Sequence, residues 1–268
     1  MSISRKLMTV GGDEPTYVND VFSATPYSGE FYNSRVTTGI ALADKAGGTS
    51  LNSIAVGGAN SQTQLTGVNW SALNLNTADF SIEFWVKETS GASLMFLIDG
   101  RDSLNEANMV IYWEGSSLRL AVGTTSILYP SSSEHYNLGN NEWNHVVFTQ
   151  RNRMISTFVN GYRYGSPQST SLYTFGVDSN SQMFNTPLGN YPLKNVELQD
   201  FRVCHGSTIY DPYAATIEVP TERLEPIDGT VLLLFNGGDT LDEMLTNKAV
   251  TEAAPLTVQG SATSAVSS

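Results

Sequence analysis

Apolar and polar residues alternate most clearly in the run Phe-Ser-Ile-Glu-Phe-Trp-Val-Lys at residues 80–87. Because successive side chains of a β-strand point to opposite faces, this run predicts a half-buried strand with Phe80 on its inner face. A second strand is predicted over residues 154–159, and it is followed by Asn160-Gly161. Both central positions of a type I′ turn need positive φ, which Asn and Gly tolerate best, so this strand is predicted to reverse into residues 162–165.

Similar short segments, separated by turn residues, continue along most of the chain. The eleven predicted strands are residues 54–56, 80–87, 93–98, 109–113, 118–122, 127–129, 143–150, 154–159, 162–164, 196–203 and 231–235. Glu114-Gly115-Ser116-Ser117 is predicted to form a hairpin between two of them. Only residues 241–248 have helical character. The pattern therefore predicts an all-β fold, a two-sheet antiparallel sandwich of jelly-roll type.

The segments that flank these strands divide the chain into three parts. Residues 1–48 are predicted to be an extended N-terminal arm for attachment, residues 49–240 the sandwich, and residues 241–268 a short helix and a tail that returns to the sandwich or to a neighbour. The arm has too few contiguous apolar residues for a core of its own. It either packs on its own sandwich or a neighbouring subunit, or is a loose tail. The apolar side chains available for such packing are Val21, Phe22, Tyr27, Phe31 and Tyr32.

Charge narrows the classes of partner. The chain has 14 Lys and Arg against 26 Asp and Glu, a formal charge of −12. Nucleic acid is therefore not an expected partner, because binding a phosphate backbone needs concentrated positive charge. Membrane insertion is not expected either, since no apolar run approaches about 20 residues. No secretory signal stands at the start and Cys204 is the only cysteine, so we expect synthesis in a cytoplasm and no internal disulfide.

Five phrases resemble, in order, the laminin-G-like, concanavalin-A-like sandwich domains found among lectins and glucanases. They are residues 72–86, 142–149, 158–161, 188–191 and 198–203. The resemblance implies a concanavalin-A-like sandwich. Residues 206–213, followed by the apolar strand at 231–235, look like the version of this domain in tailed-phage virion proteins.

The start of the chain adds a second resemblance. Residues 17–24 are similar to an arm at the start of tail and appendage proteins of marine and cyanobacterial phages, although Gly47-Gly48-Thr49-Ser50 stands where a Trp-containing strand is expected. The two resemblances together imply a non-enzymatic virion structural protein, tail- or fibre-associated and made in the host cytoplasm. Its implied partners are other virion proteins of the tail, fibre or capsid, further copies of itself and host-surface polysaccharide. The alternative is a capsid decoration or adaptor protein with purely structural subunit contacts.

A third alternative is a glycan-active enzyme. Glycoside hydrolysis needs two carboxylates a few ångströms apart, and glucanases of this fold carry them on a Glu-x-Asp-x-Glu strand. No such triplet occurs in the chain. The nearest pairs, Glu197 with Asp200 and Asp242 with Glu243, do not have the alternate spacing that would place them on one strand face. No catalytic residue is therefore predicted.

No cofactor is predicted, and calcium is the one alternative that the residues leave open. Carboxylates in loops are the usual ligands of Ca²⁺. Asp99 and Asp102 lie in the most acidic loop, and Asp200 resembles the acidic residue that the family places before its penultimate strand. A purely structural interpretation stays open. In it, Asp99 and Gly100 cap a turn, Arg101 neutralises the charge of its acidic neighbours, and Asp200 forms a hydrogen bond with a loop.

Aromatic side chains are the candidates for glycan binding, because sugar rings stack on exposed aromatic faces. Tyr112 and Trp113 alternate on one predicted strand, so one of them should face solvent. Tyr129, Tyr136 and Tyr191 lie in or beside predicted turns. Each of these five residues has the alternative role of packing or of a contact between subunits. Trp85 and Trp143, in contrast, are assigned to the sandwich and its rim.

Overall fold

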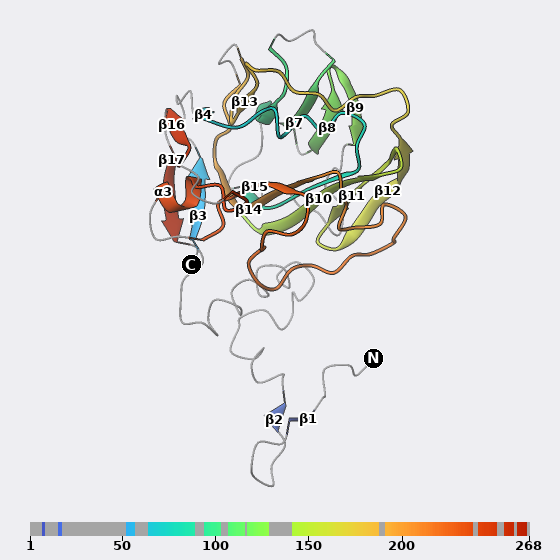
Figure 1. Ribbon diagram of the computed structural model, residues 1–268. Coiled ribbons are helices and arrows are strands. Elements are labelled where there is room, and N and C mark those ends of the chain that lie inside the picture. Colours follow the sequence, from blue (N-terminus) through green and yellow to red (C-terminus); the bar gives the residue numbers. More distant parts are fainter. Residues whose placement is uncertain are drawn as a thin grey trace.

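Two antiparallel sheets stack face to face to form a β-sandwich in the computed structural model of the chain (Figure 1). The structure describes residues 7–8, 16–17, 52–56, 64–88, 94–102, 107–115, 117–128, 141–187, 191–237, 241–250, 255–259 and 262–266. The five residues predicted to anchor the N-terminal arm lie outside the described residues. Among the described residues, no helix has the length and hydrophobicity needed to cross a bilayer.

The larger sheet has eight strands in the order β12-β11-β10-β5-β14-β3-β17, with β15 paired to β14. Their bounds are β3 Asn52–Val56, β5 Phe80–Glu88, β10 Trp143–Arg151, β11 Met154–Val159, β12 Tyr162–Ser169, β14 Val196–His205, β15 Thr230–Leu234 and β17 Ala262–Val266. The central strand β5 pairs along its length with β10 on one side and β14 on the other.

The smaller sheet has seven strands in the order β16-β4-β13-β6-β7-β8-β9. Their bounds are β4 Gln64–Thr66, β6 Met95–Asp99, β7 Met109–Glu114, β8 Ser117–Val122, β9 Thr125–Leu128, β13 Gln182–Met183 and β16 Thr257–Gln259. The remaining described elements are β1 Leu7–Met8, β2 Thr16–Tyr17, which pair with each other, and the helix α3 Leu241–Leu245. The all-β sandwich expected from the sequence is confirmed.

Each of the eleven strands expected from the sequence has a counterpart in the two sheets. The structure adds β4, β13, β16 and β17, which are two to five residues long. Strands this short carry too few alternations to be recognised from their residues. β17 pairs with β3 and β16 with β4, so the two strands near the C-terminus complete both sheets.

The two predicted hairpins are confirmed. Asn160 and Gly161 have φ of 50° and 86°, as a type I′ turn requires, and β11 reverses into β12 there. The Asn160 side chain reinforces the turn because its Oδ1 accepts a hydrogen bond from the His145 backbone N–H at 2.9 Å. At the other hairpin Glu114 pairs with Ser117 across the turn between β7 and β8.

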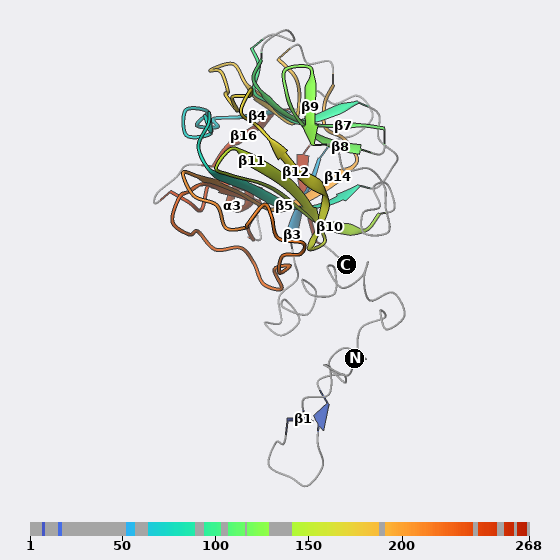
Figure 2. The same ribbon diagram turned by 90° about the vertical axis from the view of Figure 1, so that its right-hand side faces the viewer.

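The core lies between the sheets, and it receives alternate residues of β5. Phe80, Ile82, Phe84 and Val86 are fully buried there. The prediction that β5 is half-buried is wrong, however, because the opposite face of the strand is buried as well, except at Lys87. The reason is a long segment, residues 206–229, which we call the strap. It leaves β14 and crosses the outer face of the eight-stranded sheet before it enters β15 (Figures 1 and 2).

Candidate functional site

A two-sheet sandwich has two outer faces on which a ligand could bind, and the strap closes one of them. Val219 packs against Trp85 and Trp143 on the outer face of the eight-stranded sheet. Farther along, the Ser156 hydroxyl donates a hydrogen bond to the Pro212 carbonyl at 2.7 Å. Trp85 and Trp143 are 0% and 5% exposed. Their assignment to the sandwich rather than to a ligand is therefore confirmed.

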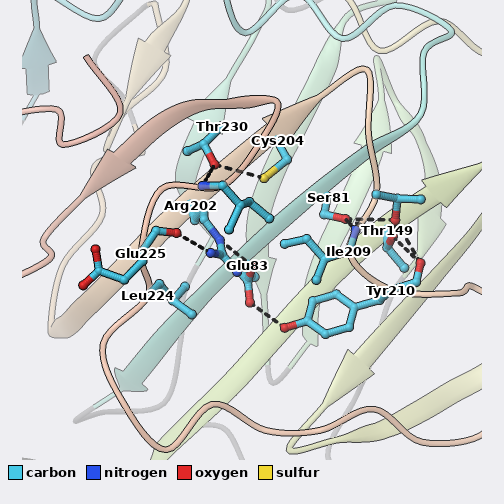
Figure 3. Close-up of polar contacts among 12 residues, drawn as sticks. Ser81, Glu83, Thr149, Arg202, Cys204, Ile209, Tyr210, Leu224, Glu225 and Thr230 are labelled. Carbon is cyan, nitrogen blue, oxygen red and sulfur yellow. Dashed lines mark hydrogen bonds and ion pairs between the residues drawn. The ribbon is translucent and has the colours of Figure 1, made fainter. Parts of the chain in front are cut away.

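A buried charged cluster ties the strap to this sheet (Figure 3). Glu83, on the outer face of β5, is 0% exposed. Its Oε1 accepts hydrogen bonds from Arg202 Nε at 2.8 Å and Nη2 at 2.6 Å. Its Oε2 accepts one from the hydroxyl of Tyr210, a strap residue, at 2.8 Å and lies 3.4 Å from His145 Nε2. The carboxylate is thus held by three side chains from three different segments.

These contacts decide the protonation of the cluster. Burial by itself raises the pKa of Glu83, but the hydrogen bond and charge of His145 and the charge and hydrogen bonds of Arg202 outweigh it, so the pKa lies below its usual value. Burial, followed by the charge of Glu83, raises the pKa of Tyr210 above its usual value. Glu83 is therefore ionised and Tyr210 neutral at physiological pH. A permanently ionised carboxylate under a covering segment is poorly suited to act as a general acid.

The other outer face, on the seven-stranded sheet, carries aromatic side chains. Phe96 alternates with core residues along β6 and points away from the core. It pairs in register with Tyr112 of β7, and the two rings stack with centroids 5.1 Å apart and planes 16° apart. Tyr191 adds a third ring, whose centroid lies 6.0 Å from that of Phe96. We call Tyr191, Phe96 and Tyr112 the aromatic row.

Two arginines border the aromatic row. Arg119 of β8 pairs in register with Tyr112, and its guanidinium lies 6.0 Å from the centroid of that ring. Arg101 lies 5.4 Å from the centroid of Phe96. Phe96 is 5% exposed, Tyr112 is partly buried and Tyr191 is 37% exposed. The exposed surface of the row is therefore provided mainly by Tyr191, with a smaller part from Tyr112.

The structure sorts the five aromatic candidates into three groups. It brings Tyr112 and Tyr191 together through Phe96. The prediction for Trp113 is wrong, because this side chain is 0% exposed and belongs to the core between the sheets. Tyr129 and Tyr136 lie outside the described residues.

Sequence reasoning missed Phe96 and the arginines beside it. Within the sequence, Phe96 is one apolar residue in the run Met-Phe-Leu-Ile, and nothing there marks it as facing outward. The only local signal is that Tyr112 and Arg119 lie on either side of the predicted hairpin at symmetric positions. Antiparallel pairing through that hairpin places them opposite each other.

The structure does not bring Asp99, Asp102 and Asp200 together as a calcium site. Arg101 engages both oxygens of Asp99, through Nε at 2.7 Å and Nη2 at 2.8 Å, as the structural interpretation expected. Asp102 is exposed on the adjoining loop. Within the described part of the chain, no group of three or more His, Cys, Asp or Glu side chains is arranged to hold a metal ion.

Asp200 instead contacts the end of the strap and the residues that follow β15. Its Oδ1 accepts a hydrogen bond from the Asn236 side chain at 2.7 Å and lies 3.9 Å from Arg223 Nη1. Burial raises its pKa to about 7, against the opposing effects of Arg223, Asn236 and the backbone N–H of Leu224. Asp200 thus has a structural role at the end of the strap.

The architecture defines a class of protein, the two-sheet lectin-like sandwich with antiparallel strands and a core between its sheets. Residues 58–206, more than half of the chain, match the Concanavalin A-like lectin/glucanases superfamily. The chain belongs to this family. No curated protein matches it in sequence.

Solved structures with a similar fold are distant. The carbohydrate-binding module CBM40 of a Ruminococcus gnavus IT-sialidase, bound to alpha2,6 sialyllactose, is 14% identical with a TM-score of 0.44, over 60% of this chain and 95% of that one. The botulinum neurotoxin serotype D binding domain is 16% identical with a TM-score of 0.39, over 57% and 42%. The botulinum neurotoxin DC binding domain in complex with rat synaptotagmin II is 13% identical with a TM-score of 0.37, over 58% and 43%. This chain thus covers less than half of each neurotoxin domain.

Proposed function

We propose that this chain is a non-enzymatic structural protein of a bacteriophage virion, associated with the tail or its fibres, and that its sandwich binds a host-surface glycan through the aromatic row. One observation carries the binding proposal. Of the two outer faces of the sandwich, the strap closes one, while the other presents clustered tyrosines from β7 and from the segment before β14. Clustered aromatic rings with hydroxyl groups suit the apolar faces and the hydroxyl groups of a sugar.

The virion context comes from the resemblance of residues 206–213 and of the N-terminal segment to phage proteins. In that setting the sandwich is displayed outward and the arm attaches it to other virion proteins. Mass spectrometry of purified particles from a phage that encodes this chain tests the context. Recovery of the protein at a stoichiometry of several copies per particle is expected, and its absence from purified particles would contradict the proposal.

Glycan binding is tested on an array of bacterial surface polysaccharides with the full chain and two variants. Tyr191→Ala removes an exposed ring of the aromatic row, and we expect a loss of about 0.5–1.5 kcal/mol of binding free energy, or roughly two- to tenfold in affinity. Tyr213→Ala is the matched control, because Tyr213 is 61% exposed on the strap, away from the row. Equal effects of the two substitutions would contradict a site at the aromatic row.

The non-enzymatic part of the proposal is supported by the state of the carboxylates. Glu83 is covered and ionised. Glu197 forms an ion pair with Lys87 at 3.2 Å and accepts a hydrogen bond from the Ser53 hydroxyl at 3.0 Å. Incubation of the protein with each bound polysaccharide, followed by measurement of newly formed reducing ends, tests this part. Turnover that disappears when a single carboxylate is replaced would overturn it.

A second candidate function, an adaptor or capsid decoration protein, is favoured by a different observation. The strap exposes Ile209, Tyr213 and Ile227, which are 37%, 61% and 42% accessible. Exposed apolar side chains of this kind are suited to contacts between subunits. Presence in virions without binding to any polysaccharide on the array would favour this function over adhesion.

A further inference from the structure

We propose that the aromatic row accepts an uncharged sugar and that Glu114 excludes acidic sugars by occupying the one partly exposed guanidinium beside it. The proposal rests on the proposed glycan-binding function and names the ligand class of that same site. It concerns the charges around the row rather than its rings.

The partly exposed cation of the row is Arg119, whose side chain is 29% accessible. Its Nη1 lies 2.8 Å from Oε2 of Glu114, which sits across the β7–β8 hairpin and is 53% accessible. A sugar carboxylate or sulfate that sought the guanidinium would find it already paired. It would also meet the negative charge of Glu114 at close range, in a chain whose formal charge is −12.

The second cation of the row is not accessible. Arg101 is 5% exposed, and its Nε and Nη2 both donate to the buried carboxylate of Asp99. A bidentate pair of this kind is among the stronger side-chain contacts in proteins. The two guanidinium groups that border the row are therefore each paired with a carboxylate.

An uncharged sugar suits such a surface. Tyr191 presents ring surface for the apolar C–H face of a pyranose, and tyrosine hydroxyl groups can exchange hydrogen bonds with sugar hydroxyls. None of these contacts depends on a net charge. The affinity for the sugar should accordingly change little with ionic strength.

The experiment compares wild type with Glu114→Gln, which keeps the shape of the side chain and removes its charge. The probes are two sets of oligosaccharides, one of neutral hexoses and 6-deoxyhexoses and one that carries uronic acid, sialic acid or sulfate. Glu222→Gln is the matched control, because Glu222 is an exposed carboxylate of the strap, on the opposite outer face. Both carboxylates are exposed, so both variants are expected to fold, which circular dichroism checks.

Wild type and Glu222→Gln are expected to bind members of the neutral set, with affinities that are unchanged between low and high salt. Glu114→Gln should gain affinity for the acidic set by about fivefold, because it removes the negative charge that stands beside the Arg119 guanidinium, a change worth roughly one kcal/mol to a bound anion. That gain should vanish at about 1 M salt, where the screening length is near 3 Å.

Three results would overturn the proposal, and they are distinguishable. A wild-type preference for the acidic set would refute the ligand class while leaving glycan binding intact. Binding of the neutral set with no gain of acidic binding in Glu114→Gln would refute the role of Glu114. Failure of every variant to bind either set would refute the proposed glycan-binding function itself, and the ligand class with it.

Discussion

Glu88 offers a direct test of how burial controls the stability of this sandwich. It is the last residue of β5, it is 2% exposed, and neither of its carboxylate oxygens has a hydrogen-bond partner among the described residues. Burial raises its pKa from 4.5 to about 7. The folded protein therefore retains a proton on Glu88 at pH values where the unfolded chain has released it.

The sign of the effect follows from this difference. Below about pH 4.5 the carboxyl is protonated in both states, and its full contribution to stability is present. As pH rises towards 7 that contribution is lost, and above 7 the buried group must be ionised. One pKa unit corresponds to 1.36 kcal/mol, so the shift from 4.5 to about 7 costs about 3 kcal/mol of unfolding free energy at alkaline pH.

The substitution Glu88→Gln removes this titration and keeps the shape of the side chain. Urea unfolding can be followed by the fluorescence of the four tryptophans. The unfolding free energy of the variant should exceed that of wild type by an amount that grows with pH, from near zero at pH 4.5 to about 3 kcal/mol at pH 8. Glu222→Gln, an exposed control, should show no such trend. A difference between Glu88→Gln and wild type that is independent of pH, or a variant that is less stable at pH 8, would refute the reasoning.

Three further substitutions probe the fold and the strap. Glu83→Gln leaves Arg202 buried without its counter-charge and should lower the unfolding free energy by about 3–5 kcal/mol in urea titrations. The strap should then be cleaved earlier by protease. Unchanged cleavage would show that the charged cluster does not hold the strap in place. Asn160→Ala places alanine at a positive φ and removes side-chain hydrogen bonds, so it should lower the unfolding free energy by about 2–3 kcal/mol. Asn160→Gly loses the same hydrogen bonds but tolerates the positive φ, so its loss should be smaller. Equal losses would show that backbone strain is unimportant there. Gly100→Ala would place Cβ 2.5 Å from the Met109 carbonyl oxygen and should lower the melting temperature more than Gly115→Ala, whose Cβ meets no atom within 4 Å and whose cost is only the backbone strain of about 1–2 kcal/mol at its φ of 61°. A milder effect at Gly100 than at Gly115 would show that the backbone around Gly100 can yield.

Much of the fold was predictable from local patterns. Alternation in β5 identified both the strand and its inner face, and the Asn160-Gly161 pair identified a hairpin together with its turn type. These features depend on side chains and dihedral angles within a few residues of one another. The short strands β13 and β16 were not predictable, because a two- or three-residue strand exists only through the neighbours that pair with it.

The candidate site was less predictable, since it depends on contacts between distant segments. Tyr112 and Tyr191 were singled out individually as candidate ligand residues, but the ring that joins them, Phe96, was not. Trp113 was misjudged for a related reason. Alternation shows that neighbouring residues face opposite sides, but it does not show which of the two sides is the core.

By itself, the sequence determined that this chain forms an antiparallel β-sandwich, because strand periodicity and turn chemistry act over short distances along the chain. The tertiary structure alone decided which outer face the strap covers. The strap has no regular apolar period of its own, and it closes the eight-stranded sheet through pairings such as Tyr210 with Glu83 and Val219 with Trp85. Partners so far apart in sequence are selected by packing and burial in three dimensions, so the location of the aromatic row on the face opposite the strap followed only from the folded chain.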